Sequence, residues 1–190
     1  MADKLGAITD SVPRTGESDR LLLHEDRNPN STGARLIGIS PQQMGSNLPK
    51  IADGIRTGQI RTLLVIGEDV TRHGIGAELL QKLDNLIVSD ILPSKTTELA
   101  HILLPGCAHA EKRGSFVNVK GRVQRFMKAM EGPGEARPEW EFLKELVEGV
   151  TGRTGPATIE GLFNQMAKDV PAFNELTWAA LGDQGVTVPL

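Results

Sequence analysis

Three short apolar segments, in which hydrophobic residues do not alternate with polar ones, constrain the fold of this chain most strongly. Their sequences are TLLVIGED at 62–69, LIVSDIL at 86–92 and HILLPG at 101–106. Apolar runs of this length predict strands that are buried on both faces, as the strands of a parallel sheet are. Segments with helical spacing separate them, so the order β-α-β-α-β predicts an α/β fold with a parallel sheet flanked by helices.

Helices are expected before, between and after these strands. Apolar residues recur at helical spacing in 46–58 and 74–84, and TTELA at 96–100 predicts a short helical turn. The segment 138–149 begins with Pro and has two Glu residues in its first turn, which is typical of a helix start. A further helix is expected at 157–170.

The remaining segments give weaker patterns. SFVNVKGRVQRF at 115–126 alternates around a Lys-Gly pair, which predicts a β-hairpin or an extended arm. RLLLH at 20–24 predicts a short strand, and Ser31 or Thr32 is expected to cap a short helix after it. The tail at 174–190 is expected to form a helix and then an extended end.

These patterns divide the chain into three parts. Residues 1–19 are polar and are interrupted by Pro and Gly, so we expect a flexible lead-in. Residues 20–152 hold the predicted strands and are expected to form a partial α/β domain. Residues 153–190 are expected to form a C-terminal helical extension and tail.

Composition excludes several classes of function. The single cysteine, Cys107, excludes a disulfide within the chain and an iron–sulfur cluster held by four thiolates of this chain alone. The net charge of −3 argues against a general nucleic-acid surface. No apolar run approaches about 18 residues, so we expect no segment that spans a bilayer. The first ten residues lack the apolar core of a secretory signal.

Polar residues follow the predicted strands at the edge where ligands of open parallel sheets lie. Gly67, Glu68 and Asp69 follow the first strand, Asp90 lies near the end of the second, and Thr96 stands in the turn after it. A glycine lets a ligand approach the backbone, and carboxylates accept hydrogen bonds from ribose hydroxyls or from a base. The alternative is that these residues cap the segments that follow them, as Asp, Ser and Thr commonly do.

Other residues that could carry chemistry favour structural roles. His101, His109 and Glu111 lack the spacing of a zinc site. Cys107 lies two residues from His109, which rarely lets a nucleophile and its base face each other. We therefore expect no catalytic residue and no metal ligand in this chain.

A long stretch of the chain resembles a known family. GQIRTLLVIGEDV at 58–70 and the segment from Leu83 to Leu146 look like the second half of the α/β region of molybdopterin oxidoreductases. DRNPNSTGARLIG at 26–38 resembles that family's Asn-x-x-Gly-Ala segment. The resemblance covers about residues 20–190 and implies a Rossmann-like parallel sheet flanked by helices, with a C-terminal helical segment.

Within that superfamily, LPGCAHAEKRGSFVNVKGRVQ at 104–124 looks most like the G subunit of NADH-quinone oxidoreductase, the large peripheral subunit of respiratory complex I. This resemblance implies a part that supports electron transfer from NADH to quinone structurally and is not catalytic alone. One alternative is a module of a molybdopterin guanine dinucleotide enzyme, such as a formate dehydrogenase large subunit. Another is a stand-alone nucleotide-binding or assembly module.

The resemblance also implies which residues would face a cofactor. In members that bind the dinucleotide, its nucleotide end lies against the strand ends, and Asn118, Arg122 and Gln124 match the family's Asn-x-x-Gly-Arg-x-Gln stretch. The cofactor-facing candidates are therefore Asn30, Gly67, Glu68, Asp69, Asp90, Thr96, Asn118, Arg122 and Gln124.

The same resemblance sets the expectations for cofactors and partners. We expect no cofactor in this chain, with molybdopterin guanine dinucleotide as the alternative, and iron–sulfur clusters only in partner domains or subunits. The expected partners are other respiratory-complex subunits, including iron–sulfur subunits, and not nucleic acid. The expected location is the cytoplasm, peripheral to the inner face of the cell membrane through those partners.

Overall fold

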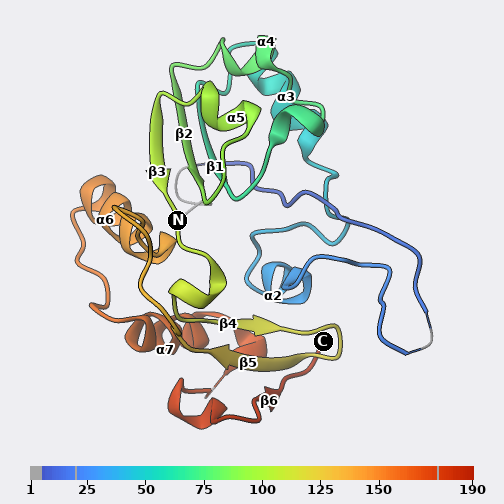
Figure 1. Cartoon of the computed structure of the whole chain (residues 1–190), viewed down its shortest axis with the longest axis vertical. Coiled ribbons are helices and arrows are strands. Elements are labelled where there is room, and N and C mark those ends of the chain that lie inside the picture. Colours follow the sequence, from blue (N-terminus) through green and yellow to red (C-terminus); the bar gives the residue numbers. More distant parts are fainter. Residues whose placement is uncertain (1–5, 20, 175) are drawn as a thin grey trace.

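The computed structural model describes residues 6–19, 21–174 and 176–190. It contains two three-stranded sheets, one above the other in Figure 1. The upper sheet consists of β1 (Thr62–Ile66), β2 (Asn85–Asp90) and β3 (Ile102–Pro105), all parallel and in the order β1-β2-β3. The predicted α/β class, with a parallel sheet flanked by helices, is confirmed.

Three helices accompany the upper sheet. They are α3 (Leu48–Arg56), α4 (Ala77–Leu80) and α5 (Lys95–Glu98), and Figure 1 shows them on one side of the strands. The apolar side of α3 and α4 packs on β1 and β2, which removes aliphatic side chains from water and stabilises this arrangement. The buried members of this core are Ile51, Ala52, Ile55, Val65, Val70, Ile75, Leu79, Leu80, Leu83, Leu86 and Val88.

The helix between β1 and β2 is shorter than predicted. Instead of a helix over 74–84, the chain forms a 3-10 turn η1 (Val70–Arg72) and then only the single turn of α4. Two glycines explain the difference, because Gly74 has a φ of 84° and Gly76 is extended. Neither conformation belongs to a helix.

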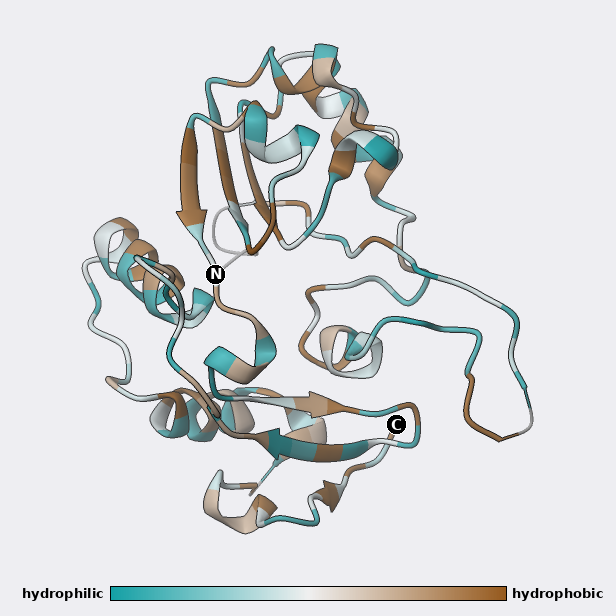
Figure 2. Cartoon of the chain, in the orientation of Figure 1, coloured by the Kyte–Doolittle hydropathy of each residue, from teal (hydrophilic) through white to brown (hydrophobic). Residues whose placement is uncertain are grey.

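Burial of the strands on both faces is only partly confirmed. Leu86 and Val88 of β2 are fully buried, whereas Ile102 and Leu103 of β3 are 47% and 54% exposed. The expectation is therefore wrong for β3, which is an edge strand of the sheet. Figure 2 shows that this exposed strand is nonetheless hydrophobic along most of its length.

The lower sheet confirms the predicted hairpin. β4 (Gly114–Val117) and β5 (Arg122–Phe126) pair antiparallel, and β6 (Val186–Thr187) pairs antiparallel with the other edge of β5. α7 (Ile159–Asp169) and the 3-10 turns η3 (Pro171–Phe173) and η4 (Ala179–Leu181) pack against this sheet. The buried core residues are Val117, Val123, Phe163, Ala167, Phe173, Trp178, Leu181 and Val188.

The two sheets are joined by Gly106–Arg113, and α6 (Glu139–Thr151) lies beside the lower end of β3 (Figure 1). The predicted helix at 138–149 is confirmed as α6, which ends at Gly152 with a φ of 65°. Only Phe142 of α6 is buried, and Leu146 and Val150 are exposed. The helix expected at the start of the tail is limited to η4, and Glu175 lies outside the described residues.

Two expectations for the N-terminal third are wrong. Leu21–His24 is not a strand but the outer part of a loop, where the backbone N–H groups of Leu21, Leu22 and Leu23 all donate to Asp19 Oδ1. Arg20 lies outside the described residues. The N-cap of α2 (Ser31–Leu36) is Asn30, and Ser31 and Thr32 are the first two residues of the helix itself.

The division at residues 19 and 152 stays a prediction, and residues 1–5 of the predicted lead-in lie outside the described residues. No helix in the described part of the chain is both long and apolar enough to cross a membrane.

Candidate functional site at the strand ends

The chain leaves β1 through a glycine with open space above it. Gly67 has a φ of 64°, a left-handed conformation that glycine adopts without steric cost. Its N–H donates to the carbonyl oxygen of Ser89 at 2.8 Å, which fixes the turn to the end of β2. A Cβ at this position would have no atom within 4 Å, so a ligand could approach the backbone here.

Asp69 joins the end of β1 to α5. Its Oδ1 accepts hydrogen bonds from the Thr71 hydroxyl at 2.7 Å and from the Thr96 hydroxyl at 2.8 Å. Thr96 is completely buried. The hydrogen bond from the Thr71 side chain lowers the pKa of Asp69, with a smaller contribution from Thr96, so this carboxylate is held ionised.

Glu68 lies between two basic side chains. One carboxylate oxygen forms an ion pair with Arg14 Nη2 at 2.5 Å, and the other lies 3.5 Å from His73 Nε2. Arg14 also donates from Nη1 to Asn28 Oδ1 at 3.0 Å. Glu68 therefore ties the loop after β1 to the N-terminal segment, and its side chain is only 16% exposed.

Asp90 acts locally at the end of β2. Its Oδ1 accepts from the backbone N–H groups of Ile91 at 2.7 Å and of Leu92 at 3.3 Å. The same kind of local capping is seen before α5, where Ser94 and not Thr96 is the N-cap and its hydroxyl accepts from Thr97 N. Asp90 therefore caps the segment that follows it, and so does Asp69, which is the N-cap of η1 and accepts from Thr71 N.

The other candidates lie at the start of α2 and in the hairpin formed by β4 and β5. Asn30 Oδ1 accepts from Val117 N at 2.7 Å and joins α2 to β4. Asn118 Oδ1 accepts from Lys120 N and Arg122 N and closes the hairpin turn. The Arg122 guanidinium donates to the carbonyl oxygen of Gln184, and Gln124 pairs across the hairpin with Phe116.

The nine candidates therefore form two groups. Gly67, Glu68, Asp69, Asp90 and Thr96 gather at the carboxyl ends of β1 and β2, with Thr96 in direct contact with Asp69. The lower group consists of Asn30, Asn118, Arg122 and Gln124. That any of them touches a cofactor stays a prediction.

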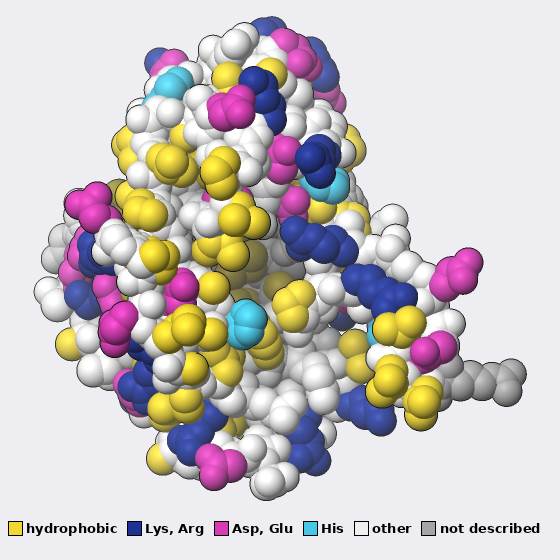
Figure 3. Space-filling model, viewed as in Figure 1, with side chains coloured by type: hydrophobic (Ala, Val, Ile, Leu, Met, Phe, Trp, Pro, Cys, Tyr) yellow, Lys and Arg dark blue, Asp and Glu magenta, His cyan; other side chains and the backbone are white. Residues whose placement is uncertain are grey.

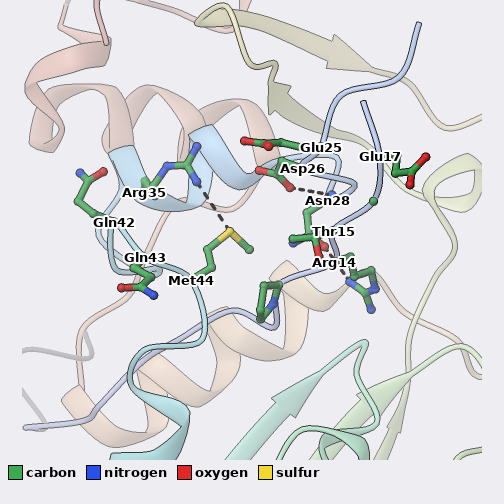
Figure 4. A pocket seen from close by; sticks show the side chains of 12 residues that line it. Arg14, Thr15, Glu17, Glu25, Asp26, Asn28, Arg35, Gln42, Gln43 and Met44 are labelled. Atoms are coloured by element: carbon green, nitrogen blue, oxygen red, sulfur yellow. Dashed lines mark hydrogen bonds between the residues drawn. The ribbon is translucent and has the colours of Figure 1, made fainter. Parts of the chain in front are cut away.

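A cavity of about 690 Å³ lies beside the upper group. Arg14 and Asn28 from the N-terminal loop line it together with Arg35 of α2, whose guanidinium faces Met44 Sδ at 3.8 Å (Figure 4). Arg14 was not among the predicted site residues. Its partner Glu68 is 54 residues further on, and no pattern in the sequence near Arg14 indicates such a pair. Arg35 could have been noticed, since it directly follows the Asn-x-x-Gly-Ala segment.

A second cavity has a volume of about 380 Å³. Leu48, Asp53 and Arg56 of α3 line it together with His73. Glu68 contacts Arg14, which lines the first cavity, and His73, which lines the second.

Only some residues of the upper group are suited to bind the nucleotide end of a dinucleotide. Gly67 leaves room at the backbone. The ionised Asp69 lies beside it, but its Oδ1 accepts from Thr71 and Thr96 and its Oδ2 lies 3.3 Å from Arg72 Nε, so a ligand would share this carboxylate with the chain itself. Glu68 fits less well, because a ligand that used its carboxylate would have to displace Arg14.

The described residues hold no group of three or more His, Cys, Asp or Glu side chains arranged to bind a metal ion. Cys107 is buried, and burial raises the pKa of its thiol, so the thiolate needed of a nucleophile is disfavoured.

Comparison with known proteins gives a consistent picture. The family described as molybdopterin oxidoreductase matches residues 1–149. The chain is 34% identical over 152 residues to the NADPH-Fe(3+) oxidoreductase subunit alpha of Geobacter sulfurreducens, covering 78% of this chain and 17% of that protein. It is 34% identical over 137 residues to the F420-dependent formate dehydrogenase 2 subunit alpha of Methanococcus maripaludis, covering 69% of this chain and 20% of that protein.

Among solved structures, acetylene hydratase from Pelobacter acetylenicus shares the fold. The TM-score is 0.58 at 17% sequence identity, and the match covers 76% of this chain and 21% of the hydratase chain. The matched part of this chain thus corresponds to about a fifth of the length of each of these larger proteins.

Proposed function

This chain belongs to the molybdopterin oxidoreductase family, and on that premise we propose that it is a structural part of the large subunit of an NAD(P)H-linked electron-transfer complex. The resemblance of residues 104–124 to the G subunit of NADH-quinone oxidoreductase is one reason for this proposal. In this role the chain packs beside domains that carry iron–sulfur clusters and performs no redox step itself. The similarity to an NADPH-Fe(3+) oxidoreductase subunit alpha supports the NAD(P)H-linked assignment.

The observation that carries this proposal is the ion pair between Arg14 and Glu68. The carboxylate that would face a nucleotide is already used inside the chain, where it holds the N-terminal loop against the end of β1. Asp90 is likewise used by the backbone that follows it. Polar side chains at the strand ends that form ion pairs and hydrogen bonds within the chain favour a structural role over cofactor binding.

The redox centres must then lie elsewhere in the complex. A cluster ligated by four thiolates cannot form on this chain, which has one cysteine, and that cysteine is buried with a raised pKa. Electrons would pass through neighbouring domains or subunits, which this chain helps to hold in place.

Native mass spectrometry with metal analysis, on the complex purified from its own source, tests the proposal. We expect co-purification with iron–sulfur subunits and no pterin dinucleotide on the polypeptide that contains these residues. Bound dinucleotide with molybdenum or tungsten would contradict it. Recovery of the chain without iron–sulfur partners would instead favour a stand-alone nucleotide-binding or assembly module.

A second candidate function is a dinucleotide-holding module, as in a formate dehydrogenase large subunit. The open space at Gly67 and the ionised Asp69 beside it favour this candidate, as does the similarity to F420-dependent formate dehydrogenase subunits. Gly67 and Asp69 would hold the nucleotide end, while the metal on the pterin would supply the redox chemistry.

Guanosine diphosphate distinguishes the two functions. In an NMR titration, the second candidate predicts shifts of the Gly67 and Asp69 amides that are lost in Asp69→Asn. The scaffold function predicts no saturable shift at either position.

A further inference from the structure

His101 directly precedes β3 and is bound to β2 at two points. Its backbone N–H donates to the carbonyl oxygen of Leu86 at 2.9 Å, and its Nδ1 accepts from Leu86 N at 3.0 Å. Both polar backbone groups of Leu86, the second residue of β2, thus bind the same residue. These two bonds are called the His101–Leu86 contact below.

The imidazole stands where a backbone acceptor is expected. In a parallel pair of strands, a backbone N–H that points to the neighbouring strand normally donates to a carbonyl oxygen there. The pairing of β2 with β3 begins only at Ile87 and Ile102. Before it the chain still follows the turn of α5, where Ala100 N donates to Thr97 O. The His101 side chain therefore supplies an acceptor one residue beyond the start of the paired strands.

β3 depends on β2 for most of its backbone pairing, because it is an edge strand. At its far end Gly106 N donates to Asp90 O at 3.0 Å, and Arg137 N donates to Pro105 O at 3.0 Å. These are bonds between backbone groups, which do not titrate. Figure 1 shows the start of β3 at the top of the upper sheet, at the end away from the candidate site. Of the two ends of β3, the start is thus held by a side chain that can take up a proton.

We propose that His101 makes the attachment of β3 to β2 sensitive to pH. An imidazole nitrogen accepts a hydrogen bond only while it carries no proton, and imidazole is the side chain that ordinarily changes its charge between about pH 5 and pH 8. A proton on Nδ1 turns the acceptor into a donor that faces the Leu86 N–H, so the bond is lost and the start of β3 is released. Leu86 is fully buried, which makes the loss of an acceptor unfavourable. The effect is the same in a scaffold and in a dinucleotide-holding module, so it is independent of the proposed function.

The charges near His101 do not offset this loss. The charged side chains beside it are Asp84, just before β2, and Lys95 and Glu98 of α5. Asp84 is paired with Arg61, and Glu98 is paired with Lys95. In the part of the chain that the structure describes, His101 forms no ion pair with a carboxylate. Figure 3 shows histidine side chains apart from one another on this face of the molecule, so each can titrate independently.

Amide hydrogen exchange, followed by NMR on the labelled 190-residue chain, tests the contact. We expect the protection factor of the Leu86 amide to be about fivefold lower at about pH 5.5 than at about pH 7.5, because one hydrogen bond is lost. The Ser89 amide, three residues further along β2, is the internal control and should keep its protection.

His101→Asp tests whether the imidazole causes the effect. A carboxylate accepts from the same N–H but stays ionised down to about pH 4, so the pH dependence at Leu86 should disappear. His24→Asp is the matched control, since His24 Nδ1 accepts from Asp26 N at 3.1 Å in an exposed loop. It should leave the pH dependence at Leu86 unchanged.

The tautomer of His101 in the wild-type chain is a second readout, which holds even if His101→Asp does not fold. Side-chain nitrogen NMR at about pH 8 should find the proton of the neutral ring on Nε2, because Nδ1 is the acceptor. A proton on Nδ1 would overturn the proposal. So would equal protection of the Leu86 amide at the two pH values, or the same pH dependence in His101→Asp.

Discussion

The hydroxyl of Thr96 donates a hydrogen bond of 2.8 Å to the carboxylate of Asp69, although the two residues are 27 positions apart. This bond connects the loop after β1 to the single turn of α5. It is formed by a threonine that solvent does not reach. The arrangement of the strand ends therefore depends on a buried polar contact as well as on the apolar core.

Thr96→Val removes this bond while keeping the shape of the side chain. We expect the free energy of unfolding to fall by about 1–3 kcal/mol, because the Asp69 carboxylate loses a buried donor. Urea denaturation measures the change. Thr187→Val, at an exposed position on β6, is the control and should have little effect. Equal losses in the two variants would contradict the structural role of Thr96.

The lowered pKa of Asp69 predicts a dependence of stability on pH. A carboxylate whose pKa is lower in the folded than in the unfolded chain stabilises the fold above its ordinary value of 3.8, and this contribution is lost as the pH falls through the folded-state pKa. The stability difference between the wild type and Asp69→Asn should therefore shrink on acidification below about pH 4. Denaturation curves that keep a constant separation from about pH 6 to about pH 2.5 would refute this prediction.

A double-mutant cycle measures the strength of the ion pair between Arg14 and Glu68. Glu68 is largely buried and Arg14 is half exposed, so we expect a coupling energy of about 0.5–1 kcal/mol from Arg14→Met and Glu68→Gln. The matched control is the more exposed pair Arg61 and Asp84, whose coupling should be smaller. Coupling that is no larger than in the control would remove the main support for the scaffold function.

Asn30 should hold α2 against the hairpin through its bond to Val117 N. Asn30→Ala is expected to cost about 1–2 kcal/mol and to speed hydrogen exchange at the Val117 amide, because that N–H loses its acceptor. Asn30→Asp retains an acceptor oxygen and should restore most of the protection. The control is Asn85→Ala, at an exposed position. Unchanged hydrogen exchange at the Val117 amide in Asn30→Ala would show that the Asn30 side chain does not hold α2 against the hairpin.

The elements that were predicted well are those with a local signal. The apolar runs gave β1, β2 and β3, and the alternation around Lys120 and Gly121 gave the hairpin. Helix length was predicted poorly between β1 and β2, because the leucines after Gly76 have helical spacing while the two glycines prevent a longer helix. The strand predicted at Leu21–Leu23 is wrong because apolar composition alone cannot distinguish a strand from an exposed loop.

The candidate site was predictable in its location and not in its contacts. Strand ends of a parallel sheet meet at one edge, which places Gly67, Asp69 and Asp90 together by rule. The partner of Glu68 is Arg14, and the partner of Asn30 is the backbone of Val117, 87 residues further on. Such pairs depend on tertiary packing, which no local periodicity encodes.

The assembly of the lower sheet has a consequence for the order of folding. β1, β2 and β3 all lie within 62–105, so the strands of the upper sheet can pair while the ribosome is still making the residues that follow. The lower sheet needs α2 from before the upper sheet and β6 from far beyond it. Its edge at β5 therefore stays unpaired until Val186 and Thr187 emerge, and during that interval the nascent hairpin is most exposed to aggregation.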